Sequence, residues 1–347
     1  MVFSLFSFEK IQKQNTTNIP VSVIICAKNE AENIKENLPL VLEQNYPQFE
    51  VVLINDASSD DTLEVFESFS EKNKTIKIVD VKNNEAFWGN KKYALTLGIK
   101  AASHEHLLFT DADCKPKSSL WIQKMSQHFS SQKSLILGYG AYKKKKNSFL
   151  NLLIRFETFL TALQYFSYAK AGSPYMGVGR NLAYTKTLFY EANGFIEHMK
   201  VRSGDDDLFV NQVGSKKNIS ASVYPQSFTV SEPETTFKNW INQKRRHIST
   251  AKYYKKSHQY ALGLFFTVNV LFYILAILLL SILFQWMYVL GIIGIKYVIQ
   301  TIVYYNAAKK LKEKDTIYAL PILEVSLILS QLVIVFSNMI SKPTHWK

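Results

Sequence analysis

The sequence predicts an α/β domain with a doubly wound, mostly parallel sheet, followed by a bundle of about three transmembrane helices. Between residues 20 and 140, short β-branched apolar runs alternate with helical patterns, which is typical of strands covered by helices on both faces. Residues 261–295 then carry no charge at all. This stretch is too long for one span of about 20 residues, so it favours a hairpin of two spans.

Four strands and three helices are expected in the sheet-forming part of the chain. The strands are expected at residues 21–26, 51–55, 76–81 and 106–110, and the helices between them at residues 29–44, 60–70 and 91–102. An apolar stripe over residues 149–168 recurs at helical spacing and carries only Arg155 and Glu157 as charges. It predicts a core helix or, alternatively, a helix on the membrane surface. A basic amphipathic helix is expected at residues 235–254.

Three transmembrane helices are expected at about residues 262–284, 286–306 and 317–340. A buried helical domain is the alternative. The lysine-rich segments at 252–256 and 309–314 should both be cytoplasmic, because cytoplasmic loops are rich in Lys and Arg. The third helix then runs outward. On that topology Lys296 and Glu324 lie at similar depths, and we expect them to pair unless Lys296 reaches an interface alone.

The charge of the chain indicates membranes and phosphorylated ligands as its partners. Its 347 residues carry a formal net charge of +13, and the basic blocks at 244–247 and 309–314 flank the long apolar stretches. No signature of nucleic-acid binding accompanies them, so membrane lipid rather than nucleic acid is the expected partner. Cys26 and Cys114 are too few for a disulfide framework, which favours a reducing compartment. Residues 1–18 lack the apolar core of a signal peptide, so the soluble part is expected in the cytoplasm.

Two carboxylates directly follow the strand expected at residues 106–110. Asp111 and Asp113 are spaced i, i+2 with no Lys or Arg between them. Ligands of open α/β sheets bind outside the carboxyl ends of the strands, and two crowded carboxylates there favour a bound cation. Mg²⁺ typically takes one or two carboxylates and completes its shell with phosphates and water. A solvated turn is the alternative.

Polar turns also follow the first two expected strands, at the same edge of the sheet. Ala27, Asn29 and Glu30 lie after the first strand, and Asp56 lies after the second. Asp56 is placed to accept hydrogen bonds from a base or a ribose. Each turn taken singly is ordinary, because Asn, Asp and Ser are common in turns, but their shared edge favours a binding site.

Two charged segments later in the chain are further candidates. Asp205, Asp206 and Asp207 precede an apolar run, where one capping acid would suffice and three repel each other. One of them is a candidate general base. The segment 243–247 reads Gln-Lys-Arg-Arg-His and precedes the first long apolar stretch. It predicts a juxtamembrane anchor to anionic lipid, a cluster that stabilises a departing pyrophosphate, or both on different helix faces.

Together these motifs resemble the family 2 glycosyltransferases, which have a GT-A-type fold, over nearly all of residues 20–250. The motifs follow one another in the order Ala-x-Asn-Glu, Asn-Asp-x-Ser-x-Asp-x-Thr, Lys-x-x-Ala-Leu, Asp-Ala-Asp, an acidic triplet and Gln-x-x-Arg. The resemblance implies that Asp111 and Asp113 bind Mg²⁺ or Mn²⁺ on a UDP- or GDP-linked sugar donor. It also implies a nucleoside site and a contact to the diphosphate, formed by Ala27, Asn29, Glu30, Asp56 and Lys91.

The resemblance further implies the residues that act on the acceptor and the leaving group. The family's Glu-Asp-x-Asp-Leu motif lines up with residues 204–208, which makes Asp205 the implied base. Gly204 replaces the acid of that motif, so Asp206 is the alternative. His247 stands where the family has a Trp that stacks on acceptor sugar. The implied contacts to the departing diphosphate are Gln243, Arg245 and Arg246.

The function that the resemblance implies is inverting, metal-dependent glycosyl transfer at the cytoplasmic face of the inner membrane. The expected organisation is an N-terminal extension (1–19), a cytoplasmic GT-A-type domain (20–255) and a transmembrane region (256–347). Members such as cellulose and hyaluronan synthases extrude polymers through channels of more helices than this chain offers. A lipid-linked acceptor, as in the ceramide glucosyltransferases, is therefore favoured over a polysaccharide. A nucleotidyltransferase and a non-catalytic membrane scaffold for polysaccharide export are the alternatives.

Overall fold

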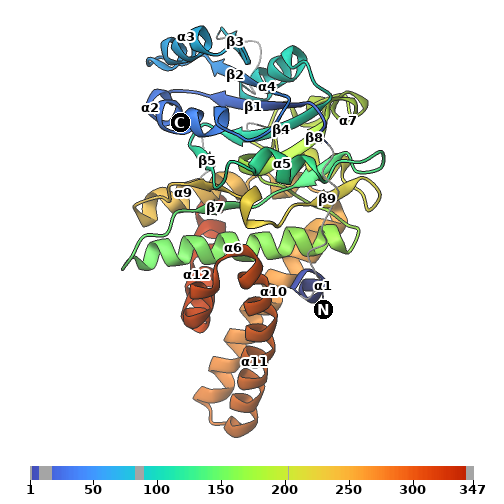
Figure 1. Cartoon of the computed structure of the whole chain (residues 1–347). Coiled ribbons are helices and arrows are strands. Elements are labelled where there is room, and N and C mark those ends of the chain that lie inside the picture. The colour runs from blue at the N-terminus through green and yellow to red at the C-terminus, as the bar shows by residue number, and fades with distance from the viewer. Residues whose placement is uncertain (1, 8–17, 83–89, 202, 341–347) are drawn as a thin grey trace.

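A computed structural model of the chain describes residues 2–7, 18–82, 90–201 and 203–340. Of the expected N-terminal extension, residues 1 and 8–17 lie outside the described residues, and Val2–Ser7 forms a short helix, α1. Figure 1 shows a sheet-bearing domain at one end of the molecule and long apolar helices at the other. The long helix α6 (Phe149–Lys170) runs between these two parts.

Seven strands form the main sheet, in the order β3-β2-β1-β4-β8-β6-β9. β1 is parallel to β2 and β4, and β2 is parallel to β3, while β8 is antiparallel to its two neighbours. This order confirms the predicted doubly wound, mostly parallel sheet. In sheet order the strands are Ile76–Val81 (β3), Phe49–Asp56 (β2), Val21–Ala27 (β1), His106–Asp111 (β4), Leu182–Thr185 (β8), Leu135–Leu137 (β6) and Ile219–Ala221 (β9).

A small second sheet adjoins the main one, and helices cover the main sheet. The second sheet consists of β5 (Cys114–Pro116), β10 (Thr229–Ser231) and β7 (Gly140–Tyr142), in that order. The helices of the domain are α2 (Ala31–Leu42), α3 (Thr62–Lys72), α4 (Asn90–Ala101), α5 (Trp121–Ser126), α7 (Lys186–Glu191), α8 (Asp207–Val213) and α9 (Phe237–Ile248). All the strands and helices predicted before residue 112 are present, with bounds that differ by at most two residues.

Successive residues of β1 point into two different apolar cores. Val23 and Ile25 pack with Ile34 of α2 on one face of the sheet. Ile24, between them in sequence, belongs to the core on the other face, together with Leu95 of α4. Side chains alternate along a strand, so a strand covered on both faces has to be apolar at every position. This explains why the predicted strands are continuous apolar runs.

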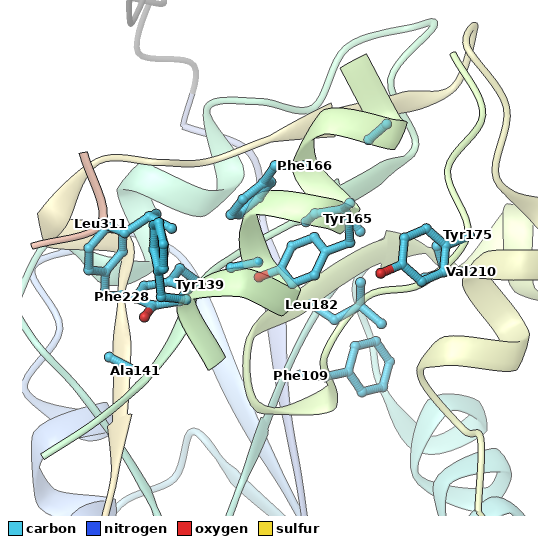
Figure 2. Close-up of a cluster of buried hydrophobic side chains, with 14 of the residues drawn as sticks. Phe109, Tyr139, Ala141, Tyr165, Phe166, Tyr175, Leu182, Val210, Phe228 and Leu311 are labelled. Atoms are coloured by element: carbon cyan, nitrogen blue, oxygen red, sulfur yellow. The ribbon is translucent and has the colours of Figure 1, made fainter. Parts of the chain in front are cut away.

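Helix α6 is a core helix, which decides between the two interpretations of its apolar stripe. Phe156 and Phe159 are fully buried. Figure 2 shows Tyr165 and Phe166 of α6 among apolar side chains from several strands and helices. The Tyr165 hydroxyl donates a hydrogen bond to the Gly138 carbonyl at 2.8 Å. One side of the helix therefore packs on the sheet-bearing domain, and the other side packs against the apolar helices.

An ion-pair network with a buried core, Arg155 and Glu313, holds the apolar helices to α6. Arg155 Nε lies 3.0 Å from Glu313 Oε2, and its Nη2 lies 2.6 Å from Asp315 Oδ2. Lys144 adds a second cation, 2.6 Å from Asp315. Removing one partner of a buried pair leaves an uncompensated charge, so such a network strongly resists separation of the segments that it joins.

By length and composition, three described helices are apolar enough to cross a membrane, as the sequence predicted. They are α10 (Lys256–Ser281), α11 (Trp286–Leu311) and α12 (Leu320–Ile340). Figure 1 shows α10 and α11 as a hairpin that extends away from the sheet-bearing domain. Most large apolar side chains along the hairpin are exposed. Exposed apolar surface of this extent is typical of contact with lipid.

The course of α12 differs from the one that the sequence predicted. Its start follows the short helix η5 (Lys314–Ala319), which the Arg155 network joins to α6. Near its other end, Ser337 O and Asn338 Oδ1 accept hydrogen bonds from Arg245 of α9 at 3.1 and 2.9 Å. Both ends of α12 thus contact the sheet-bearing domain, and the outward course expected for the third helix is wrong. The outward course was predicted from the positive charge of the flanking loops. Such charge does not indicate that a helix packs back along its own domain.

The predicted contact between Lys296 and Glu324 is confirmed. Lys296 Nζ lies 2.7 Å from Glu324 Oε2. Gln300 Nε2 donates to the other carboxylate oxygen at 2.8 Å, and the Tyr273 hydroxyl donates to Oε2. One carboxylate of α12 therefore joins side chains of α10 and α11. Charges among membrane helices are expensive and usually pair in this way.

Reversing one charge of this pair should destabilise the helical part of the protein. Lys296→Glu or Glu324→Lys places like charges together, and we expect a loss of about 3–5 kcal/mol, the usual cost of breaking a buried pair. The measurement is the melting temperature of the protein in detergent. The double reversal should recover most of the loss, while Lys309→Glu at an exposed position of α11 should have little effect. A double variant no more stable than either single variant would contradict the pairing.

Candidate functional site

Two carboxylates that fit a divalent cation lie at the end of β4 and just after it. One oxygen each of Asp111 and Asp113, together with Cys114 Sγ, lie within 4.8 Å of one another. Burial and the charge of Asp113 raise the pKa of Cys114 well above its ordinary value, and its thiol lies 3.0 Å from the Ser231 hydroxyl. Cys114 therefore stays a neutral thiol, which a hard cation does not select as a ligand. The two carboxylates are the ligands that Mg²⁺ and Mn²⁺ prefer.

Lys91 lies between two of the acidic segments and neutralises both. The first turn of α4 places its Nζ 3.0 Å from Asp111 Oδ1 and 3.1 Å from Asp205 Oδ2. Desolvation opposes the charge of Lys91, but the two carboxylates outweigh it and hold the pKa of Lys91 well above its ordinary value. Lys91 is hydrogen-bonded to Asp111 through Oδ1. The Lys91 ammonium group thus holds the carboxylates of Asp111 and Asp205 close together.

The three adjacent carboxylates before α8 have three different partners. Asp205 takes part in the ion pair just described. Asp206 Oδ2 accepts a hydrogen bond from the Gly179 N–H at 2.6 Å. Asp207 is buried and its Oδ2 accepts a hydrogen bond from the Tyr254 hydroxyl at 2.6 Å. The three carboxylates therefore do not all serve to cap α8, because each has a different hydrogen-bond or ion-pair partner.

These partners separate the acidities of Asp205 and Asp206. Desolvation would raise the pKa of Asp205, but the charge of Lys91 outweighs it, and the pKa is lowered. Desolvation and the neighbouring charges of Asp205 and Asp207 raise the pKa of Asp206 to about 7. A carboxylate with a pKa near the working pH accepts a proton most effectively, which makes Asp206 a candidate general base beside Asp205. The sequence favoured Asp205 because of the alignment of residues 204–208 with the family motif. That alignment says nothing of the ion pair between Asp205 and Lys91.

A cavity of about 520 Å³ lies beside these carboxylates. This volume falls within the range of about 300–1,000 Å³ that is usual for ligand sites. Its wall includes Asp111, Asp113 and Asp206 at one end, continues between α6 and α9, and reaches α10 and α12 at the other. The cavity thus connects the acidic cluster with the apolar helices.

The structure brings most of the predicted site residues to this one cavity. Those that line it are Lys91, Asp111, Asp113, Asp205, Asp206, Gln243 and Arg246. Arg245 lies outside the lining, because α9 turns it toward α12, where it binds Ser337 and Asn338. Helix α9 therefore has one face at the cavity and another against an apolar helix, and both roles expected of its basic segment stay predictions.

Four predicted residues lie at the same edge of the sheet but outside the lining of the cavity: Ala27, Asn29, Glu30 and Asp56. Asn29 Oδ1 accepts a hydrogen bond from Ser59 N at 2.8 Å, and Glu30 N donates to Thr62 Oγ1 at 2.9 Å. Asp56 is buried, and burial raises its pKa. These bonds hold the first two turns of the sheet together in a fixed arrangement.

Arg180 is a cavity residue that the sequence analysis missed. Its guanidinium carbon lies 4.3 Å from the centre of the Tyr142 ring, and the side chain lines the cavity together with Asp113. Its Nη1 donates a hydrogen bond to the Ser231 hydroxyl at 3.3 Å. A guanidinium held by stacking and a hydrogen bond is suited to phosphate groups. The available signal was weak: Arg180 follows glycines at 177 and 179, just before a short strand. A lone Arg after two glycines does not by itself predict a site.

Comparison with known proteins identifies the family. The model of glycosyl transferase family 2 matches residues 22–200, more than half of the chain, and that of glycosyl transferase family group 2 matches residues 123–309. A poly-beta-1,6-N-acetyl-D-glucosamine synthase of Staphylococcus epidermidis is 40% identical over 93 residues, which are 27% of this chain and 21% of the synthase. An uncharacterized glycosyltransferase of Haemophilus influenzae is 34% identical over 122 residues, 35% of this chain and 36% of that protein.

The match to the synthase covers about one fifth of that protein's length. Among solved structures, a mannosyltransferase from Pyrobaculum calidifontis, in complex with GDP-Man and Mn²⁺, superposes with a TM-score of 0.59 at 17% identity. The superposition covers 93% of this chain and 92% of the mannosyltransferase, and it confirms the expected GT-A-type fold. With this fold and a family model that matches more than half of its residues, the chain belongs to glycosyltransferase family 2.

Proposed function

We propose that the protein is a membrane-anchored, inverting glycosyltransferase that moves a sugar from a UDP- or GDP-linked donor to a hydroxyl of a lipid-linked or polysaccharide acceptor. The single observation that carries this proposal is the arrangement in one cavity of Asp206, Asp111 and Asp113. A base with a pKa near neutrality and a pair of cation-binding carboxylates are the two parts that this transfer requires.

The donor diphosphate would lie at the acidic end of the cavity. Asp111 and Asp113 would hold Mg²⁺ or Mn²⁺, and when bound the cation offsets the negative charge of the leaving nucleoside diphosphate. The Arg180 guanidinium and the side chains of Gln243 and Arg246 line the same cavity and supply further donors for phosphate oxygens. The adjacent turns with Ala27, Asn29, Glu30 and Asp56 would contact the nucleoside.

The chemical step follows from the different roles of the acidic triplet. Asp206 takes the proton of the acceptor hydroxyl while its oxygen bonds to the anomeric carbon, and the bond from that carbon to the diphosphate breaks. Asp205 is held by Lys91, and Asp207 accepts a hydrogen bond from Tyr254, so neither is available as a nucleophile. A single displacement inverts the anomeric configuration.

The cytoplasmic location of the sheet-bearing domain is supported by the position of the basic segments. The end of α11 contacts this domain, because Lys310 Nζ donates to Phe6 O of α1 and the following turn carries Glu313, the partner of Arg155. The lysine-rich segment 309–314 therefore lies on the same side as the domain. Segments rich in Lys are retained in the cytoplasm, which favours the cytoplasmic face of the membrane.

The assignment of the base is tested by Asp206→Asn. Turnover should fall by about 10²–10⁴-fold, the usual share of general base catalysis, while donor affinity stays close to that of the wild type. The assay is transfer from a panel of UDP- and GDP-sugars with Mn²⁺, with donor affinity measured by thermal shift. Asp205→Asn releases Lys91 and should alter donor affinity more than turnover. The reverse ranking of the two variants would move the base to Asp205.

The raised pKa of Asp206 predicts the pH dependence of the reaction. A base acts in its deprotonated form, so kcat should rise with pH through an inflection near 7, the pKa to which burial and its neighbours raise this carboxyl. The residual activity of Asp206→Asn should lack this inflection. A wild-type profile that is flat between about pH 5.5 and 8.5 would exclude this carboxyl as the base.

The metal site is tested by binding rather than by activity. Asp113→Asn should weaken Mn²⁺ binding by at least about 10-fold, and Asp111→Asn somewhat less, because an amide carries no charge to offset that of a hard cation. Electron paramagnetic resonance measures free Mn²⁺ directly. Glu67→Gln, which changes an exposed acid of α3, is the matched control. Wild-type affinity in both aspartate variants would rule out the pair as the metal site.

A further inference from the structure

The far half of the cavity is lined by one face each of two apolar helices. On α10, Leu262, Phe265, Phe266 and Asn269 line it, spaced i, i+3, i+4 and i+7. These four side chains are half-buried, whereas neighbours on the other faces of the helix, such as Val268, are exposed. The lining face of α10 is therefore partly enclosed by the protein, and the rest faces outward.

Helix α12 closes the cavity from the other side with a second such face. Its lining residues include Glu324, Leu327, Ile328, Gln331 and Ile334, again at helical spacing. Glu324 brings no free charge to the cavity, because its carboxylate is bound by Lys296 and Gln300. Of the ten lining residues that α10 and α12 contribute, six are apolar, and Asn269, Glu324, Ser330 and Gln331 are polar. The apolar majority suits an alkyl chain better than a hydrated glycan, which needs hydrogen-bonding partners along its whole path.

Several polar side-chain atoms in the wall of the cavity have no hydrogen-bond partner among the residues that the structure describes. In the described part of the chain, Thr158 Oγ1 of α6, Trp240 Nε1 of α9 and Gln243 Oε1 have no hydrogen-bond partner. All three residues line the cavity, and Thr158 and Trp240 are 8% and 1% exposed. Buried polar atoms are almost always satisfied, so these orphans beside α6 and α9 in the wall of one cavity point to a polar ligand group there.

We propose that the acceptor is a membrane lipid that carries a hydroxyl head group, with its alkyl chain between α10 and α12 and its polar part at Thr158, Trp240 and Gln243. This inference rests on the proposed function and names the acceptor class for the same site. The course of α12 makes it possible, since a helix that returns to the domain places an apolar wall next to the acidic cluster. Deprotonation by Asp206 is required for a hydroxyl acceptor, which favours an alcohol over an already ionised phosphate.

Photolabelling tests the lipid site without any need for activity. The full-length protein in nanodiscs of phosphatidylethanolamine and phosphatidylglycerol is exposed to hexadecanol that carries a diazirine and an alkyne. Labels should concentrate on the cavity faces of α10 and α12. Ile328→Trp, which fills the cavity, should reduce labelling there, whereas Leu329→Trp, at a position 58% exposed on the same helix, should not. Equal labelling of both variants would overturn the proposal.

A second pair of variants tests the lipid site independently, in case a variant of the first pair does not fold. Asn269→Trp fills the cavity from α10, and Val268→Trp, at a position 54% exposed, is its matched control. The melting temperature of each variant in detergent shows whether it folds. The proposal requires that either cavity-filling variant, when folded, loses labelling relative to its control.

The nature of the product gives an independent readout. With a radiolabelled donor sugar and Mn²⁺, the product of the wild type in proteoliposomes should partition into butanol. A cavity-filling variant should lose this product by about 10²-fold, as expected for an acceptor misplaced by about 1 Å, at unchanged donor affinity. An aqueous polymer as the product would overturn the lipid acceptor and indicate a glycan. Failure of the wild type to bind any nucleotide sugar would instead contradict the proposed function, and photolabelling would still decide on the lipid site.

Discussion

The site depends on one half-buried cation. Lys91 joins Asp111 at the end of β4 to Asp205 in the turn before α8, two segments far apart in the chain. At an effective dielectric constant of about 20, two unit charges 4 Å apart interact with about 4 kcal/mol, so the five aspartates at the cavity would not stay ionised together without such a neighbour. Lys91 sets the low pKa of Asp205 and thereby leaves Asp206 as the carboxylate that titrates near neutrality.

Helix α6 connects this site to the apolar helices. Its apolar face completes the core on the sheet, while Arg155 binds Glu313 and Asp315 in the turn that follows α11. The helix also carries Thr158 along the cavity wall. A rigid connection of this kind is what a transfer reaction at a membrane requires, because an acceptor held among apolar helices has to meet a base fixed by the sheet within about 0.5 Å of its productive position.

Much of the fold and part of the site followed from local sequence patterns. The strands, the helices that cover them and the apolar helices were predicted correctly because each depends on periodicity within about ten residues. Asp111 and Asp113 were found because the end of a parallel strand is a known location for ligands. The Lys296–Glu324 pair was predicted because a charge in an apolar helix needs a partner, and few were available. Arg180 was missed, since nothing near it in sequence indicates that it faces Asp113.

The sequence by itself determined the positions of the strands near the amino end, the family resemblance and the segments that carry charge. The tertiary structure decided that the pKa values of Asp205 and Asp206 shift in opposite directions, that Arg245 binds α12 rather than lining the cavity, and that α12 returns to the domain. The physical reason is the same in each case. Periodicity and turn chemistry act between neighbours in the chain, whereas the pKa of a carboxyl and the partner of a guanidinium are set by charges that folding brings from segments many residues away.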